Sequence, residues 1–175
     1  AIRSALSAQP DKKHIIISRV EHPAVRVLCS HLETEGYRVT QLPVDKSGIL
    51  DLELLDKSLT PDTALVSLMW GNNETGVIFP VEEAAHLAHD KGAMFHTDAV
   101  QAAGKIPINM KNNLIDMLSL SGHKLHAPKG VGVLYIRRGT KFTPLLLGGH
   151  QERGRRGGTE NTPGIIGLGK ACELA

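Results

Sequence analysis

The chain has few cysteines, few aromatic residues and little net charge. Its two cysteines, Cys29 and Cys172, form no CxxC pair and cannot make a disulfide framework, so we expect a reducing, cytoplasmic compartment. Aromatic residues make up only 3% of the 175 residues, which argues against base-stacking platforms for nucleic acid. The 20 basic and 18 acidic residues leave a formal charge of +2, too small to predict a nucleic-acid partner.

Long apolar runs are also missing. No stretch approaches the ~20 apolar residues that a membrane-spanning helix needs. The first thirteen residues, "AIRSALSAQPDKK", carry charges where a signal peptide would need an apolar segment. We therefore expect no membrane partner.

Short apolar runs alternate with amphipathic segments along the whole chain. Periodicity predicts strands at 14–18, 37–44, 63–70, 93–97, 114–120 and 132–136. Proline near the start, glycine near the end and helical spacing predict helices at 23–36, 51–59, 80–92 and 162–175. This order predicts an α/β fold, with a mostly parallel sheet flanked by helices in one domain.

Polar residues follow four of the predicted strands. They are His22 after 14–18, Asn73 in "NNETG" after 63–70, Asp98 after 93–97, and the segment 121–124, "SGHK", after 114–120. In parallel sheets, ligands bind outside the carboxyl ends of the strands, which share one edge. The spacing therefore predicts a site at this edge.

Each of these residues also has a purely structural explanation. Asp98 could cap a short helix, "NNETG" could be only a turn, and His22 could be only a helix-entry residue. A lysine such as Lys124 is usually a solvated surface residue. Together, at the ends of strands that share one edge, these residues indicate a site.

Lys124 indicates one particular cofactor. A lysine at such an edge can form a Schiff base with a carbonyl, and desolvation helps by lowering its pKa. If the carbonyl belongs to pyridoxal phosphate, the cofactor also needs an acid at its ring nitrogen, a flat group on its face and donors for its oxygens. Candidates of each type are present: Asp98 for the ring nitrogen, His22 for stacking, Gln101 for the phenolic oxygen, and Ser121 and His123 for the phosphate.

Five strings make a specific resemblance. They are, in chain order, "VEHPAV", "NNETG", "HTDAVQAAGK", "SLSGHKLHAPKGVGVLYIRRG" and "GGHQERGRRGGTENTPGIIGLGKA". Through them the chain resembles the cysteine desulfurases of the NifS/IscS type. These enzymes belong to the aminotransferase class V group of fold-type I pyridoxal phosphate enzymes.

The resemblance implies a role for each candidate. Lys124, and not Lys129, would carry the cofactor aldehyde, and His22 would stack on the ring and serve as an acid–base group. The remaining implied cofactor contacts are Asp98 at the pyridinium nitrogen, Gln101 at the phenolic oxygen, Asn73 near the cofactor oxygen and the substrate carboxylate, Ser121 and His123 at the phosphate, and Thr159 at the phosphate of a second subunit in a homodimer.

The implied reaction removes sulfur from L-cysteine to give L-alanine. Lys124 would take the α-proton, which requires a pKa lowered by a surrounding pocket. A mobile cysteine would then carry the sulfur as a persulfide to an iron–sulfur scaffold protein.

The chain departs from the family in what it lacks. Neither cysteine matches the family's acceptor loop, and we expect Cys29 and Cys172 to be small buried hydrophobic residues. Residues 1–175 are expected to form the large cofactor-binding domain, without the N-terminal flank and the C-terminal small domain, and to be inactive alone in persulfide transfer.

Three alternatives remain open. Selenocysteine lyase, of the same family, shares these motifs. A metal hydrolase would use nitrogen and oxygen ligands drawn from His96, Asp98, His123, His126 and His150, although these lack a zinc-protease spacing. A phosphate- or nucleic-acid-binding module would use the basic loop containing Arg153, Arg155 and Arg156.

Overall fold

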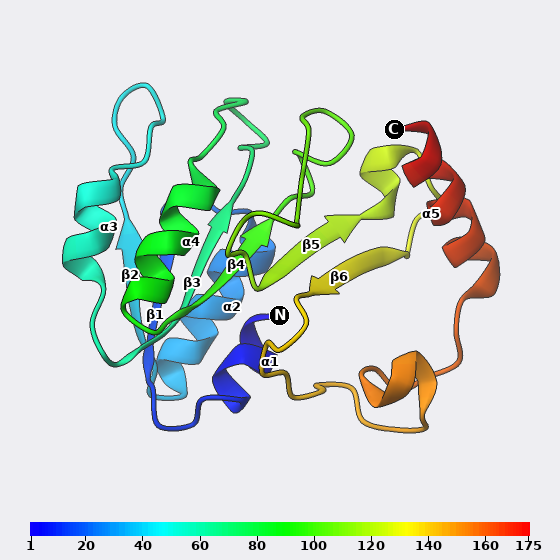
Figure 1. Ribbon diagram of the computed structural model, residues 1–175, viewed down its shortest axis with the longest axis horizontal. Coiled ribbons are helices and arrows are strands. Elements are labelled where there is room, and N and C mark those ends of the chain that lie inside the picture. The colour runs from blue at the N-terminus through cyan, green and yellow to red at the C-terminus, as the bar shows by residue number, and fades with distance from the viewer.

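A computed structural model describes all residues from 1 to 175, which form one sheet with helices on both faces (Figure 1). The elements in chain order are α1 Ile2–Ser7, β1 His14–Ser18, α2 Pro23–Thr34, β2 Arg38–Leu42, α3 Leu52–Ser58, β3 Thr63–Met69, α4 Val81–Asp90, β4 Met94–Asp98, β5 Met117–Ser121, the 3-10 turn η1 Gly122–Leu125, β6 Gly132–Ile136, the 3-10 turn η2 Gln151–Gly154, and α5 Thr162–Leu174. Every predicted strand and helix is confirmed, with ends that differ by a few residues.

The six strands lie in the order β2-β1-β3-β4-β5-β6. All neighbours are parallel except β5 and β6, which form an antiparallel pair. The chain moves from β1 outward to β2 and then returns to place β3 on the other side of β1. The strand order therefore reverses between β1 and β3, and such a reversal opens a crevice at the carboxyl ends of the two strands.

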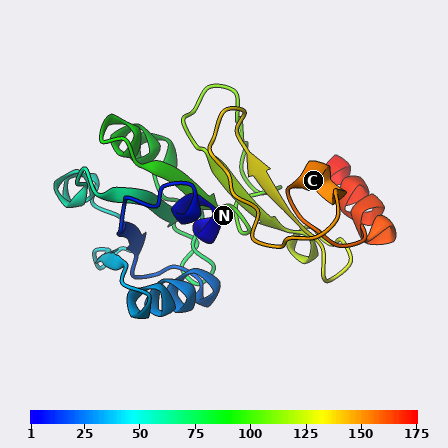
Figure 2. The same cartoon turned by 90° about the horizontal axis from the view of Figure 1, so that it is seen from below.

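Two separate apolar cores cover the two faces of the sheet. The core that includes Ile15, Ile17 and Leu65 packs against α1 and α2. The other, larger core includes Val66, Leu68 and Phe95 and packs against α3 and α4. Figure 2 shows these helices on opposite sides of the strands. Because successive strand residues point to opposite faces, continuous apolar strands such as β3 supply both cores.

The β5–β6 end of the sheet is more open than the rest. Val133 on β6 is 39% exposed, and the segment that follows β6 exposes Leu145, Leu146 and Leu147. Helix α5 lies at the far end of this hairpin, beside η1, in both views (Figures 1 and 2). None of the helices combines the length and the apolar character that a membrane-spanning segment requires.

Two features differ from the sequence-based expectation. No element was predicted in the first thirteen residues, but Ile2–Ser7 form α1, whose apolar side chains pack on the sheet. The prediction that both cysteines are buried is wrong for Cys172, which is exposed on α5, whereas Cys29 is fully buried. The open side of α5 explains this, because only Gly164 and Leu168 of that helix are buried.

Two histidines are buried in the sheet as neutral rings. His14 Nδ1 lies 2.8 Å from Thr63 Oγ1, and its Nε2 lies 2.9 Å from Thr40 Oγ1. His96 lies between the hydroxyls of Ser67 and Ser119, at 2.8 Å from each. Burial lowers the pKa of His14 to about 4 and that of His96 to about 3.

These histidines predict an acid-labile fold, which His14→Gln tests. Below its ordinary pKa of 6.5 the His14 ring binds a proton in the unfolded chain, but in the folded chain only near pH 4. Folding stability from His14 is therefore complete above pH 6.5 and is lost as the pH falls towards 4. We expect the free energy of unfolding of the wild type, relative to that of His14→Gln, to fall by about 1–2 kcal/mol over this range, allowing for solvent screening.

Urea denaturation at several pH values measures this difference. His86→Gln is the matched control because His86 is exposed on α4 and makes no hydrogen bond. Equal pH dependence of the wild type and His14→Gln would show that His14 is not held neutral by the fold.

Candidate functional site

The predicted site residues gather along one edge of the sheet. Met69, Asp98 and Ser119 are in register across β3, β4 and β5. The carboxyl ends of these strands lie along the upper edge of the sheet in Figure 1. This edge therefore carries Asp98 in its middle, with the loop after β1 on one side of it and η1 on the other.

Asp98 is the last residue of β4 and is half-buried. Its Oδ1 accepts a hydrogen bond from the Val100 N–H at 2.9 Å, and its Oδ2 accepts none from the protein. The helix-cap explanation is wrong, because residues 100–105 form turns and no helix follows, so the Asp98 carboxylate caps a turn. Gln101 lies in these turns, and its Oε1 accepts a hydrogen bond from Lys105 Nζ at 3.0 Å. One carboxylate oxygen thus remains available at the centre of the edge.

His22 is the N-cap of α2 and is exposed. Its Nδ1 accepts a hydrogen bond from the Ala24 N–H at 3.1 Å. A neutral imidazole that accepts at one nitrogen carries its proton on the other, so the cap places the N–H of His22 at Nε2. The helix-entry explanation is therefore correct but incomplete, since the Nε2–H of this exposed ring is left without a protein partner.

The two asparagines of "NNETG" have different surroundings. Asn72 is buried, and its Oδ1 accepts from the N–H groups of Glu74 and Thr75 while its Nδ2 donates to Val20 O. Asn73 is exposed and donates only to its neighbour Glu74. Asn72 therefore forms the turn, and Asn73 is the member that can contact a ligand.

Lys124 lies in η1, directly after β5, and is exposed. It makes no hydrogen bond or ion pair with the protein, unlike its neighbours: Ser121 Oγ and His123 Nδ1 lie 2.8 Å apart. Lys124 is exposed, so residues 1–175 alone do not form the desolvating pocket that its role as a base requires, and that pocket stays a prediction. The amine is free, and a hydroxyl and an imidazole lie beside it.

Gly122 allows the tight turn that presents Lys124. The Gly122 N–H donates to Val131 O at 2.9 Å, and an added Cβ would lie 2.9 Å from both that oxygen and Val131 Cγ1. The turn ends at His126, whose left-handed backbone (φ 64°) reverses the chain toward β6. Residue 122 lies so close to Val131, directly before β6, that only glycine fits there without a shift of the backbone.

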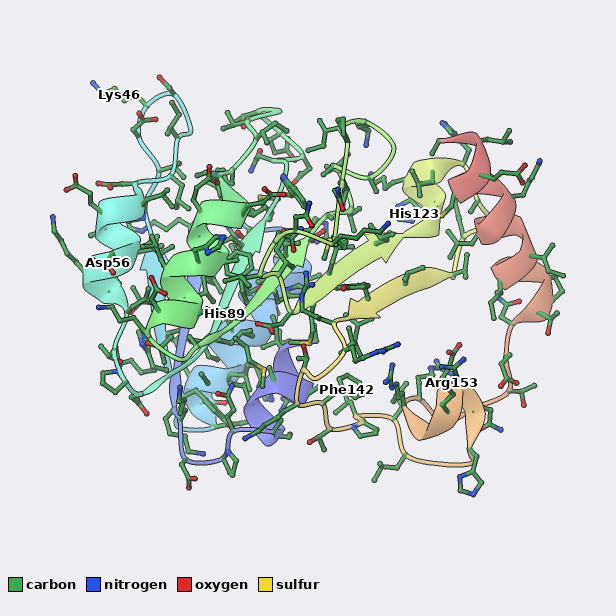
Figure 3. The ribbon with its side chains drawn as sticks, viewed as in Figure 1. Lys46, Asp56, His89, His123, Phe142 and Arg153 are labelled. Carbon is green, nitrogen blue, oxygen red and sulfur yellow. The ribbon has the colours of Figure 1, made fainter.

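Thr159 does not join this edge. It is exposed in the segment between η2 and α5, which Figure 1 shows beyond the open side of β6. Arg153, on the same basic loop, lies well apart from His123 in Figure 3. The resemblance assigned Thr159 to a second subunit, and its position is compatible with that assignment.

The residues of the metal-hydrolase alternative do not converge. No group of three histidine, cysteine, aspartate or glutamate side chains is close enough to hold a metal ion. His96 is occupied by Ser67 and Ser119 within the sheet. This alternative therefore has no site in the structure.

Sequence reasoning missed one residue at this edge, Glu21. It is 2% exposed between β1 and α2, directly before His22. The available signal was its place in "VEHPA", between a buried strand and a proline-initiated helix, but a glutamate is expected on the surface by default.

Comparison with known proteins identifies the family. The aminotransferase class-V model matches residues 1–175, and the chain belongs to this family. It is 67% identical over 175 residues to the cysteine desulfurase NifS of Azotobacter vinelandii, and covers 44% of that protein. A solved NifS-like protein matches 99% of the chain with TM-score 0.94 and 43% identity, over 48% of its own chain. A solved structure described as SspA in complex with cysteine matches 97% of the chain with TM-score 0.91 and 42% identity, over 49% of its own chain.

Gly122→Ala tests whether the turn depends on close packing. Because the added methyl group meets a backbone oxygen as well as a side chain, we expect a loss of about 1–3 kcal/mol in the free energy of unfolding. Gly169→Ala in α5 is the control: its Cβ meets nothing within 4 Å, and alanine there is expected to stabilise the helix by about 0.5–1 kcal/mol. Thermal denaturation of both variants measures the difference, and equal behaviour would contradict this account of the turn.

Proposed function

We propose that this chain is the cofactor-binding part of a pyridoxal phosphate-dependent cysteine desulfurase, which converts L-cysteine to L-alanine and an enzyme-bound persulfide. The observation that carries the proposal is the free amine of Lys124 beside the Ser121–His123 pair, on the same sheet edge as Asp98. The chain spans about 44% of the A. vinelandii relative, so the complete activity belongs to the proposal. A cytoplasmic location, suggested by two free cysteines, belongs to it as well.

The donor set fits pyridoxal phosphate. The phosphate needs hydroxyl and imidazole donors, and Ser121 and His123 supply both within 2.8 Å of each other. The ring nitrogen needs a carboxylate, and Asp98 keeps one oxygen without a partner. Lys124 supplies an amine that is not engaged elsewhere. When bound, the cofactor would act as the electron sink for the bonds broken at the substrate α-carbon.

The protein residues then have separate tasks. Lys124 would hold the aldehyde carbon and, once released, accept the substrate α-proton at Nζ. Asp98 would keep the proton on the ring nitrogen by its negative charge. His22 would cover the ring face, with its Nε2–H available as a donor. Gln101 would contact the phenolic oxygen, and Asn73 would lie near the cofactor oxygen and the substrate carboxylate.

The proposal also includes partners. The related SspA structure contains cysteine, which supports L-cysteine as substrate. A homodimer would bring Thr159 of a second copy to the phosphate, and an iron–sulfur scaffold protein would accept the sulfur. Cys29 is unsuited to carry that sulfur, because burial raises the pKa of its thiol to about 12 and holds it in the unreactive form.

A visible absorption spectrum with added pyridoxal phosphate tests the central assignment. We expect the purified chain to acquire the absorption band of lysine-bound pyridoxal phosphate and to keep it through gel filtration. Lys124→Ala should lose the band completely, because Lys124 is the residue proposed to bind the cofactor aldehyde.

Lys129→Ala is the matched control, since Lys129 is exposed on the same connection between β5 and β6. It should retain the band. A band that survives in Lys124→Ala, or a folded wild-type chain that never acquires one, would contradict the proposal.

A further inference from the structure

Glu21 lies at the reversal point of the strand order, where α/β sheets bind ligands. It connects the carboxyl end of β1 to that of β3 and is 2% exposed. A buried carboxyl group at this position is costly unless it has a structural or chemical role.

Its two oxygens are used very differently. Oε1 accepts a hydrogen bond from Ser18 Oγ at 2.6 Å and another from the Met69 N–H at 3.0 Å. Oε2 is buried and has no partner. Either form of the carboxyl group can accept these two bonds at Oε1, whereas no group of the protein stabilises a charge on Oε2.

The surroundings of Glu21 oppose a negative charge. No lysine, arginine or histidine pairs with it, and the hydrogen bonds from the Ser18 hydroxyl and the Met69 N–H lower the pKa of Glu21 by less than burial raises it. The titratable groups that face it are Asp98 from β4 and Cys29 from α2. Burial, with a smaller contribution from the charge of Asp98, raises the pKa of Glu21 to about 7.

We propose that Glu21 is a positioning residue and a charge switch: through Oε1 it holds the loop carrying His22 to the end of β3, and ionisation at its unpartnered Oε2 adds a second negative charge to the sheet edge that carries Asp98. The connection is direct. Glu21 immediately precedes the helix cap His22 and accepts a hydrogen bond from the N–H of Met69, which is the register partner of Asp98. The influence on bound pyridoxal phosphate rests on the proposed function, whereas the titration of Glu21 does not.

Carbon-13 NMR of the side-chain carboxyl groups tests the switch in the chain without cofactor. We expect the Glu21 resonance to titrate near pH 7 instead of near the ordinary 4.5, and the Asp98 resonance to show an inflection at the same pH. In Glu21→Gln, which keeps an acceptor oxygen but cannot ionise, the Asp98 inflection near pH 7 should disappear. Glu33→Gln, an exposed glutamate on α2, should keep it.

The positioning role has its own measurements. Glu21→Ala leaves the Met69 N–H and Ser18 hydroxyl without their acceptor, so we expect the nitrogen-15 signals of His22 to lose the pattern of a single tautomer. The affinity for pyridoxal phosphate should fall on the order of tenfold. Glu21→Gln and Glu33→Gln should keep both the tautomer pattern and the affinity.

The outcomes separate the two proposals. A wild-type Glu21 that titrates near 4.5, or a wild-type Asp98 resonance with no inflection near pH 7, overturns the switch, and neither result requires a variant to fold. An unchanged His22 signal with unchanged affinity in Glu21→Ala overturns the positioning role. A wild-type chain that shows the Glu21 titration but binds no pyridoxal phosphate contradicts the proposed function while supporting the switch.

Discussion

Parallel pairing of the strands is the constraint on which the site depends. Four parallel interfaces join β2, β1, β3, β4 and β5, so every one of these strands ends on the same edge. Parallel neighbours need crossover connections, and the crossovers through α2, α3 and α4 cover both faces with apolar side chains. Polar side chains that follow the strands consequently have one place to gather, although they come from distant parts of the sequence.

The same sheet holds several polar groups in a neutral form. His14 and His96 are saturated by hydroxyl groups of neighbouring strands, and Glu21 receives two donors on one oxygen. Neutral groups can be buried at small cost when their hydrogen bonds are satisfied, whereas charges need a partner. The histidines and Glu21 respond oppositely to pH: acid disfavours the folded state through the histidines and favours it through Glu21.

Most of the fold was predictable because its strands are short apolar runs bounded by turn residues. Helix α1 was missed because it has six residues and no side-chain cap, which leaves too little periodicity to detect. The exposure of Lys124 and Cys172 was not predictable either, since it depends on which face of η1 and α5 the rest of the chain leaves open. Glu21 escaped because burial of a carboxyl group is decided by the strand ends around it, not by its own sequence neighbours.

Each site motif combines a buried supporting residue with an exposed or projecting residue that follows it closely in the sequence. In each one, a buried residue fixes the backbone and a following residue projects from it: Glu21 before His22, Asn72 before Asn73, and Gly122 before Lys124. The buried member is held by hydrogen bonds to another strand end or by close packing, as with Met69 N–H for Glu21 and Val131 O for Gly122. Placement of a projecting side chain within a fraction of an ångström requires such support from rigid elements. The supporting residue acts on the backbone next to the projecting one, which is why the members of each pair lie only one or two residues apart in the sequence.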